Sequence, residues 1–362
     1  MKKFRLGQSR DAEDLDRGTE TRREGRGQSK RRQRSAERLS TENEAHDAEA
    51  LLRLPDAGPW MHLPEATLVQ RHSQWVDLEL PDRSLILATL SGKLKGVKLV
   101  CGDRVRYSAQ PVEAVDPKLP QAQVIAITPR RTLLKRGGID DREPWQLMAA
   151  NADELWVCAA VVDPPLRPGL LERAQVLALD AGLLLRVIVT KRDRVSKEDT
   201  LPELDALREQ GVPIFETSAK NGEGVDALKA ALGDRIAVLI GHSGVGKSTL
   251  VNALHPEADL RTGGLTKFGT GRQTTTAARW LPLEGGGTLI DTPGIRTLSV
   301  RGFDRGLLGA IFPEFPADWI EDPMALDPED EDLDLDYPER LQSLQRLWLE
   351  MEERNPNQRG GG

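Results

Sequence analysis

Apolar residues recur as short runs through the middle of the chain, and each run ends in a polar or glycine-containing turn. Four of these runs lie at residues 183–189, 212–216, 235–240 and 288–290. Runs of this length, bounded by turn signals, predict strands. Residues 249–254 follow the third run directly and are typical of a helix. This part of the chain is therefore predicted to form a doubly wound α/β sheet.

A different pattern precedes it, because residues 66–127 contain shorter β-like runs separated by Gly92, Gly96 and Gly102. Five strands are predicted, at residues 67–69, 75–80, 85–88, 105–107 and 124–127. Their number and spacing favour a small Greek-key barrel of the OB type, a surface that often binds nucleic acid. Basic residues lie in and after the third loop, where a merely solvated loop is an equal alternative: Lys93, Lys95, Lys98, Arg104 and Arg106.

The end of the chain shows helical periodicity, since Leu341, Leu344, Trp348 and Met351 fall on one face. Residues 338–353 are predicted to form an amphipathic helix that packs on the preceding domain rather than on a partner. Before it, residues 321–340 hold ten acidic residues against one arginine, a net charge of −9. Like-charge repulsion predicts a solvated linker there.

Length and composition set the remaining limits. The 362 residues suggest two or three domains, and 38% hydrophobic residues suffice for a globular core. No apolar run approaches the ~20 residues of a membrane-spanning helix, and the charged amino terminus lacks a signal-peptide core. We therefore expect a cytoplasmic protein without a membrane partner. The two cysteines, Cys101 and Cys158, are expected to be reduced core residues.

The amino terminus differs from the rest in charge. Residues 1–40 carry 13 Lys and Arg against 7 Asp and Glu, a net of +6, while the whole chain carries −7. Few apolar residues interrupt this segment, so we expect a disordered basic arm over residues 1–60. Such an arm binds RNA phosphates through counterion release, or it serves only as a solubilising tail. The acidity of the remaining chain favours the first interpretation.

The third apolar run leads into a complete G-x-x-x-x-G-K-S phosphate loop. Its glycines let backbone N–H groups surround phosphates, its lysine reaches the β- and γ-phosphates, and its serine ligates Mg²⁺. The motif between a strand and a helix predicts that the chain binds a nucleoside triphosphate. The nucleotide-binding residues predicted here are Gly241, His242, Ser243, Gly244, Val245, Gly246, Lys247, Ser248 and Thr249.

The nucleotide base is predicted from two other strand ends. The run at 183–189 ends in Thr190-Lys191-Arg192-Asp193, of the N/T-K-x-D type, in which the aspartate accepts hydrogen bonds from guanine N1 and N2. Adenine lacks that pair of donors, which argues against an ATPase. About twenty-five residues later, Ser218-Ala219-Lys220 matches the S-A-K element that meets the guanine carbonyl. Either element alone is typical of an ordinary turn, but the two together favour GTP and GDP as the bound nucleotides.

Two switch elements follow the phosphate loop. Asp291-Thr292-Pro293-Gly294 matches D-x-x-G, in which Asp291 holds Mg²⁺ through water and the Gly294 amide meets the γ-phosphate. In the earlier segment 271–276, one of the threonines is expected to complete the magnesium shell. The base-reading elements thus precede the phosphate loop, which indicates a circular permutation. The chain leaves directly after the second switch, so whatever follows is coupled to the γ-phosphate sensor.

These motifs resemble the RsgA family, also called YjeQ, of small-ribosomal-subunit-dependent GTPases. The resemblance covers about residues 65–315, and it includes Gly102-Asp103-Arg104-Val105 and the segments 129–136, 149–153 and 271–276. It implies GTP hydrolysis stimulated by the small subunit and its rRNA, in late maturation of that subunit, and it implies that Thr275 is the magnesium ligand of segment 271–276. We expect a monomer. The implied architecture is an OB-type barrel (65–130), a circularly permuted P-loop GTPase domain (145–300) and a short, mostly helical extension (301–362).

The chain departs from this family at the zinc module. Family members carry Cys and His ligands after the GTPase domain, whereas here no Cys follows Cys158 and no His follows His255. A structural zinc site needs such thiolate and imidazole ligands. We therefore expect no zinc site.

Catalysis requires charge stabilisation, predicted from Lys247, Mg²⁺ and the Gly294 amide, and a positioned water. Ile295 stands where Ras-type enzymes place a water-orienting glutamine, and its aliphatic side chain has no polar group for that task. Gln273 replaces a histidine that is usual in the family. It either orients the water without acting as a base or contacts rRNA. The alternative function is a GTP-dependent ribosome-binding module with negligible hydrolysis.

Overall fold

The structure, a computed structural model, describes most of the chain after residue 57. The described residues are 58–72, 75–94, 96–109, 120–138, 144–196, 199, 201–256, 278–292, 298–328 and 338–352. Contacts separate Met1–Asp47 from a second unit, Ala48–Gly362. All that follows concerns the second unit, and the predicted basic arm lies almost entirely outside the described residues.

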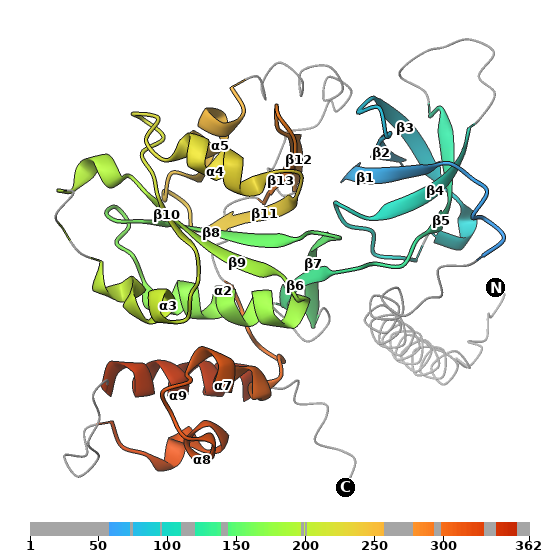
Figure 1. Ribbon diagram of the computed structural model, residues 1–362. Coiled ribbons are helices and arrows are strands. Elements are labelled where there is room, and N and C mark those ends of the chain that lie inside the picture. Colours follow the sequence, from blue (N-terminus) through green and yellow to red (C-terminus); the bar gives the residue numbers. More distant parts are fainter. Residues whose placement is uncertain are drawn as a thin grey trace, which may run out of the picture. The chain divides into compact units, whose positions relative to one another are not determined.

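A closed barrel of five strands follows residue 64 (Figure 1). The neighbour order is β1-β2-β3-β5-β4, in which β3 and β5 are parallel and the other pairs are antiparallel. Each strand contains one of the five predicted runs. Leu68, Leu78 and Val105 are fully buried inside it. The strands are β1 (Glu65–Arg71), β2 (Trp75–Glu79), β3 (Leu85–Leu90), β4 (Arg104–Ala109) and β5 (Ala122–Ile127), with a 3₁₀ turn η1 (Gly92–Leu94).

A two-stranded antiparallel sheet, which the sequence did not predict, joins the barrel to the rest of the chain. It pairs β6 (Leu133–Gly137) with β7 (Trp145–Ala150). The Ala150 amide donates to the Cys101 carbonyl at 2.9 Å. Gly102 has φ +92°, and a Cβ there would lie 2.1 Å from the Ala150 carbonyl oxygen. Only glycine therefore fits this close approach between the barrel and β7.

The main sheet has six strands in the order β10-β9-β8-β11-β13-β12. All neighbours are parallel except β12, which pairs antiparallel with β13. The four apolar runs of the sequence each lie in one of these strands. The bounds are β8 (Glu154–Ala160), β9 (Leu184–Thr190), β10 (Ile214–Glu216), β11 (Ile236–Gly241), β12 (Arg279–Pro282) and β13 (Thr288–Asp291).

Helices cover both faces of this sheet. In Figure 1, α2 (Pro168–Ala181) and α3 (Asp205–Glu209) lie on one face, and α4 (Val225–Leu232) and α5 (Lys247–Leu254) on the other. Successive residues of β8 point to opposite faces, so Leu155 packs in the α2 core and Trp156 in the α4/α5 core. Every residue of β8 is buried. This two-sided cover is why the central strands read as continuous apolar runs.

After residue 298 the chain forms short helical segments and one longer helix. They are η5 (Arg305–Leu307), α7 (Leu308–Ile311), α8 (Ala317–Glu321), η6 (Pro323–Ala325) and α9 (Pro338–Glu352); another 3₁₀ turn, η3 (Pro202–Leu204), precedes α3. The prediction of one solvated linker over residues 321–340 was wrong for its first part. Pro323 is buried, and the Gln345 side chain donates to the carbonyls of Pro323 and Leu326, both at 2.8 Å. Both of these contacts are made by backbone carbonyls of the segment.

The predicted amphipathic helix is confirmed as α9, which packs against α2. Leu341, Leu344 and Met351 belong to the same core as α2, and the fourth predicted residue, Trp348, is partly buried and packs against that core. Leu347 is fully buried, whereas Trp348 lies at the edge with its ring 3.6 Å from the Arg305 guanidinium. Its indole N–H satisfies the Glu321 carbonyl at 3.2 Å, a polar contact that favours the edge over the core.

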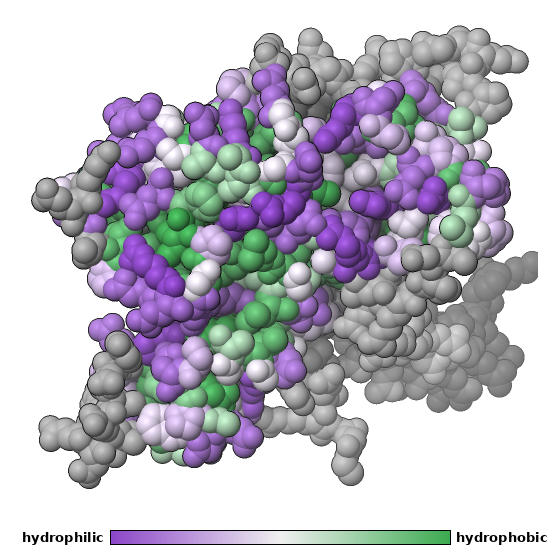
Figure 2. All heavy atoms as spheres, viewed as in Figure 1, coloured by the Kyte–Doolittle hydropathy of each residue, from purple (hydrophilic) through white to green (hydrophobic). Residues whose placement is uncertain are grey.

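The face of the molecule drawn in Figure 2 is mainly polar. Figure 2 shows hydrophilic residues over most of the visible face, with smaller hydrophobic groups between them. Within the described ranges, no helix is both long and apolar enough to cross a membrane. The two cysteines are buried and unbonded to each other, and burial raises the pKa of the Cys158 thiol to about 12. Both cysteines therefore behave as core residues.

Candidate nucleotide-binding site

The predicted motifs meet at one edge of the sheet. Parallel pairing aligns the ends of β9 and β10, where Val189 lies opposite Glu216, and of β11 and β13, where Leu239 lies opposite Asp291. Each motif therefore emerges at the carboxyl end of its strand. In open α/β sheets this edge is where ligands bind.

The phosphate loop leaves β11 and enters α5 at Lys247. Gly244 and Gly246 adopt left-handed φ values of +83° and +95°, which L side chains rarely allow. A Cβ on Gly241 would lie 2.8 Å from the Cys158 carbonyl oxygen. Because these residues have no side chain, the backbone N–H groups stay accessible where the loop turns toward the helix N-terminus. The loop thus has the form of a phosphate cradle, and it fits the predicted nucleotide.

The other residues of the phosphate loop differ in their exposure to solvent. Val245 is buried beneath it, His242 is half-buried, and Ser243, Ser248 and Thr249 are exposed. The Ser248 hydroxyl therefore stands at the accessible start of α5. That is the position from which a P-loop serine reaches Mg²⁺.

Lys247 carries its charge into the interior of the site. Its side chain is 8% exposed, and its Nζ donates to the Asp291 carboxylate and the Thr292 carbonyl. The Thr292 hydroxyl donates in turn to the Leu239 carbonyl at 2.8 Å, which fixes the end of β13 against β11. The lysine and the aspartate of two separate motifs thus lie together at the predicted phosphate and magnesium position.

The first base-reading element is fastened to the phosphate loop. Lys191 has φ +59°, an uncommon conformation that costs about 1–3 kcal/mol in a residue other than glycine. Its Nζ donates to the Gly244 carbonyl at 2.6 Å and to the Asp163 carbonyl. The buried Thr190 hydroxyl donates to the Val245 carbonyl. Both side chains stabilise the loop's backbone, and Thr190 is turned to that backbone rather than to the solvent.

The two base-reading elements meet through Asp193 and Ser218. The Ser218 hydroxyl donates to Asp193 Oδ1 at 2.7 Å. This hydrogen bond lowers the pKa of the Asp193 carboxyl below its ordinary value, and the charge of the exposed Lys220 contributes. Ser218 is buried, Ala219 is half-buried, and Asp193 itself is exposed. The corner therefore presents an ionised carboxylate that remains open to a ligand with N–H donors.

Some predicted residues lie outside the described part of the chain. They are Gln273 and Thr275, within residues 257–277, and Gly294 and Ile295, within residues 293–297. Their assigned roles remain predictions. Of the three predicted magnesium ligands, the structure places Ser248 and Asp291 at this edge.

Asp163 and Arg194 also reach the site, although neither belongs to a predicted motif. Asp163, in the loop after β8, supplies a carbonyl to Lys191, and its carboxylate pairs with Arg194 at 2.5 Å. Asp163 lies three residues after the buried strand β8, at the same edge of the sheet as the motif residues. The same strand-end position was the available signal for it.

Comparisons with known proteins agree with this geometry. The family model described as RsgA GTPase matches residues 127–301. Two similar proteins are both named "Small ribosomal subunit biogenesis GTPase RsgA". The one from Gemmatimonas aurantiaca is 36% identical over 237 residues, which cover 63% of this chain and 75% of that protein. The one from Shewanella oneidensis is 33% identical over 253 residues, covering 69% and 70%.

Solved structures are also similar. YjeQ from Thermotoga maritima matches with a TM-score of 0.57 and 26% identity, over 81% of this chain and 99% of that one. A structure described as "YloQ, a circularly permuted GTPase" matches with a TM-score of 0.56 over 83% and 99%, at 21% identity. The second likeness supports the fold alone. Together with the strand order, these matches establish the permuted fold.

Proposed function

The chain belongs to the RsgA GTPase family, and from that premise we propose that it hydrolyses GTP during maturation of the small ribosomal subunit. The observation that carries the proposal is the corner formed by Lys191, Asp193 and Ser218. An exposed, ionised carboxylate stands beside a lysine that is fixed on the phosphate loop. One nucleotide with a guanine base spans both features.

We assign base recognition to that corner. The Asp193 carboxylate accepts from guanine N1 and N2, and the Lys191 stem packs over the base. The segment Ser218, Ala219 and Lys220 offers a backbone N–H to the guanine carbonyl. Support comes from the Ser218–Asp193 hydrogen bond, which holds the carboxylate of one loop against the other. The remaining nucleotide-binding residues are Thr190 and the loop Gly241, His242, Ser243, Gly244, Val245, Gly246, Lys247, Ser248 and Thr249.

We assign phosphate and magnesium binding to the neighbouring motifs. Lys247 contacts the phosphates, while Ser248, Thr275 and Asp291 hold Mg²⁺, the last through water. Magnesium supplies charge neutralisation between the β- and γ-phosphates. The pairing of Lys247 with Asp291 supports this arrangement, because it places a cation and a carboxylate beside the cradle.

The attacking water has no obvious partner in the second switch, where Ile295 is aliphatic. We assign its orientation to Gln273, with the Gly294 amide on the γ-phosphate. Because Gln273 does not titrate near neutral pH, it orients water without serving as a general base. The alternative is a GTP-dependent ribosome-binding module with negligible hydrolysis. Ile295 and Gln273 favour it if neither of them activates the water.

The partner is the small subunit, and we propose that its rRNA meets the basic arm and the barrel. Lys93 and Arg104 are exposed there and suit phosphate contacts. Arg106 is committed to the fold instead, because it donates to the Leu63 carbonyl and pairs with Glu65 at 2.8 Å. This division leaves fewer candidate contacts than the sequence suggested.

We further propose a cytoplasmic monomer without a zinc site. Its parts are the arm (1–60), the OB-type barrel (65–130), the permuted GTPase domain (145–300) and the extension (301–362). The proposal on zinc rests on ligand chemistry, since no Cys or His follows His255. In this chain α9 packs on α2 without thiolate or imidazole ligands of its own.

Single-turnover GTP hydrolysis with and without purified small subunits tests the proposed function. We expect a rate of ~10⁻⁴ to 10⁻³ s⁻¹ for the protein alone, as for a P-loop GTPase without a supplied activator. Small subunits should accelerate it by orders of magnitude. Gln273→Ala should abolish the acceleration while GTP affinity stays within a few-fold, and Gln273→His should preserve it. Absence of acceleration in the wild type would support the ribosome-binding module instead.

A further inference from the structure

Arg192 occupies the variable position of the Thr190-Lys191-Arg192-Asp193 element, and no motif assigns it a role. Its residue is 8% exposed, although arginine is rarely buried without partners. It begins the 3₁₀ turn η2 (Arg192–Arg194), which carries Asp193. The burial of this arginine therefore depends on the acceptors that surround its guanidinium.

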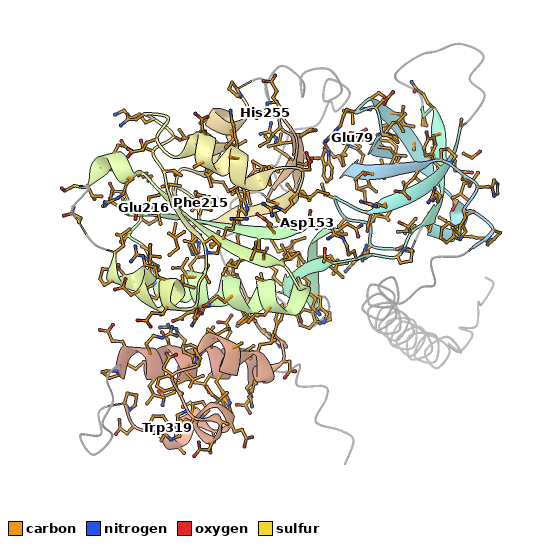
Figure 3. All side chains as sticks on the ribbon, in the orientation of Figure 1. Glu79, Asp153, Phe215, Glu216, His255 and Trp319 are labelled. Carbon is orange, nitrogen blue, oxygen red and sulfur yellow. The ribbon has the colours of Figure 1, made fainter. Side chains whose placement is uncertain are left out.

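The guanidinium donates hydrogen bonds to three residues. Nε donates to Glu216 Oε2 at 2.7 Å, Nη1 to the Ser196 carbonyl at 2.8 Å and Nη2 to the Asp199 carbonyl at 2.9 Å. Glu216 is the last residue of β10 and is labelled in Figure 3. The side chain therefore ties the segment after η2 to the strand that leads into Ser218.

The backbone of Arg192 repeats this connection. Its N–H donates to the Thr217 carbonyl at 3.0 Å, and the Thr217 N–H donates to the Val189 carbonyl at 2.7 Å. One residue thus links the two base-reading elements through both main chain and side chain. It does so between Lys191, whose φ is +59°, and Asp193. A conformation of that kind persists only where its surroundings determine it fully.

We propose that Arg192 is the positioning residue that sets guanine selectivity, because it holds Asp193 where one carboxylate meets both N1–H and the 2-amino group. This inference rests on the proposed function. Asp193 is exposed, and its carboxylate is oriented by the 2.7 Å bond from Ser218 and by the backbone N–H of Asp193 itself. Its direction therefore depends on the turn beneath it, and Arg192 fixes that turn from both sides.

The planar fork of arginine is what the site requires. Three acceptors from two segments, the loop after η2 and the end of β10, surround one guanidinium, and each nitrogen serves one of them. A lysine at this position keeps the charge but offers a single point donor on a flexible stem, so it does not reproduce the fork. Arg192→Lys therefore separates the geometric role from the charge.

The test compares GDP with inosine diphosphate, which keeps the N1–H donor and lacks the 2-amino group. Both dissociation constants are measured by calorimetry for wild type, Arg192→Lys and Arg192→Gln. Arg208→Gln is the matched control, since Arg208 lies 3.9 Å from the same Glu216 carboxylate but belongs to α3. Thermal midpoints without nucleotide show whether each variant is folded.

We expect wild type and Arg208→Gln to prefer GDP, and Arg192→Lys to lose that preference by about tenfold, the contribution of one charge-assisted hydrogen bond. Affinity for inosine diphosphate should fall less than affinity for GDP, because inosine makes only one of the two contacts that a displaced carboxylate loses. An unchanged preference in Arg192→Lys, or an equal loss for both nucleotides, would overturn the proposal. If Arg192→Gln does not fold, Arg192→Lys decides alone. A wild type that binds neither nucleotide would contradict the proposed function instead.

Discussion

The base-reading corner and the carboxyl-terminal extension are held to the same domain by different means. In the corner, single polar contacts join short loops, such as Ser218 to Asp193 at 2.7 Å. In the extension, α9 buries Leu341, Leu344 and Leu347 completely against the α2 core. The comparison teaches that ligand specificity can rest on a few polar contacts around one exposed carboxylate, whereas the position of the extension rests on buried apolar area.

The extension also makes polar contacts close to the second switch. Glu350 of α9 accepts the Val300 N–H at 3.0 Å with one oxygen and Arg173 of α2 at 2.6 Å with the other. Val300 follows the second-switch segment by a few residues. One carboxylate therefore links α9, α2 and the chain that leaves the switch, which gives the coupling expected from the permutation a structural basis.

The largest effect should come from the extension's core. Leu344→Ala removes a fully buried side chain and should lower the free energy of unfolding by about 2–5 kcal/mol, from the lost burial and the cavity left behind. GDP affinity of the folded protein should not change. Leu349→Ala, at a position 46% exposed, is the control and should leave the thermal midpoint nearly unchanged. Denaturant titration and GDP calorimetry measure both quantities, and equal destabilisation by the two variants would contradict the packing.

The opposite pattern is expected in the corner. Asp193→Ala should weaken GDP binding by at least about tenfold, since hydrogen bonds to charged groups contribute about 1.5–3 kcal/mol. The thermal midpoint should stay near that of wild type, because the carboxylate is exposed. Equilibrium binding of labelled GDP measures the effect. Equal affinity in wild type and variant would mean that another loop reads the base.

Local signals predicted most of the sheet, the barrel and the ligand loops. The run at 235–240 and the phosphate loop are contiguous in sequence, so their pattern alone fixes strand, turn and helix. Contacts between distant residues left no such pattern. Arg192 and Glu216 are 24 residues apart, and Val300 and Glu350 are 50 apart. Neither pair was predicted, because each of these residues fits its own local helix, strand or turn pattern and nothing in that pattern points to the distant partner.

The β6–β7 sheet and the burial of Leu347 in α9 were not predicted. β6 contains Lys135 and Arg136, and a register shift interrupts its pairing, so neither an alternating nor a continuous apolar pattern appears. In α9 both Leu347 and Trp348 are compatible with helical spacing from Leu344. The choice between them depends on the Glu321 carbonyl and Arg305, which the sequence places far away.

A smaller effect is expected for the link between extension and switch. Glu350→Gln keeps an acceptor for the Val300 N–H but removes the charge that pairs with Arg173. Both side chains are about one-fifth exposed, so the loss of stability should be about 1 kcal/mol. Urea titration measures it. A change in GDP affinity of more than about twofold would show that the extension and the corner are not independent.

Acidification should reveal the contribution of Ser218. Its hydroxyl lowers the pKa of Asp193, so in wild type the binding-competent carboxylate persists as the pH falls, until the pH passes that lowered pKa. Ser218→Ala should raise the pKa toward its ordinary value. GDP binding should then fail at a higher pH than in wild type, with only a few-fold loss at neutral pH. Calorimetry across acidic pH tests this, and coincident profiles would contradict the role of the hydrogen bond.

The smallest effect, none, is expected from metal chelation without nucleotide. Because Cys and His ligands are lacking after His255, the extension should keep its thermal midpoint in a chelator. Metal analysis that finds one tightly held zinc per chain would contradict the proposal. It would also mean that the extension depends on more than the packing of α9.

The central claim, that Asp193 reads a guanine base from a preassembled corner, is tested most directly by reversing the base. Asp193→Asn replaces two acceptors by an amide whose N–H donors suit the C2 carbonyl of xanthine. Binding of GDP and xanthosine diphosphate is compared in wild type and variant. The account predicts that wild type prefers GDP and that Asp193→Asn prefers xanthosine diphosphate. A variant that still prefers GDP would contradict it.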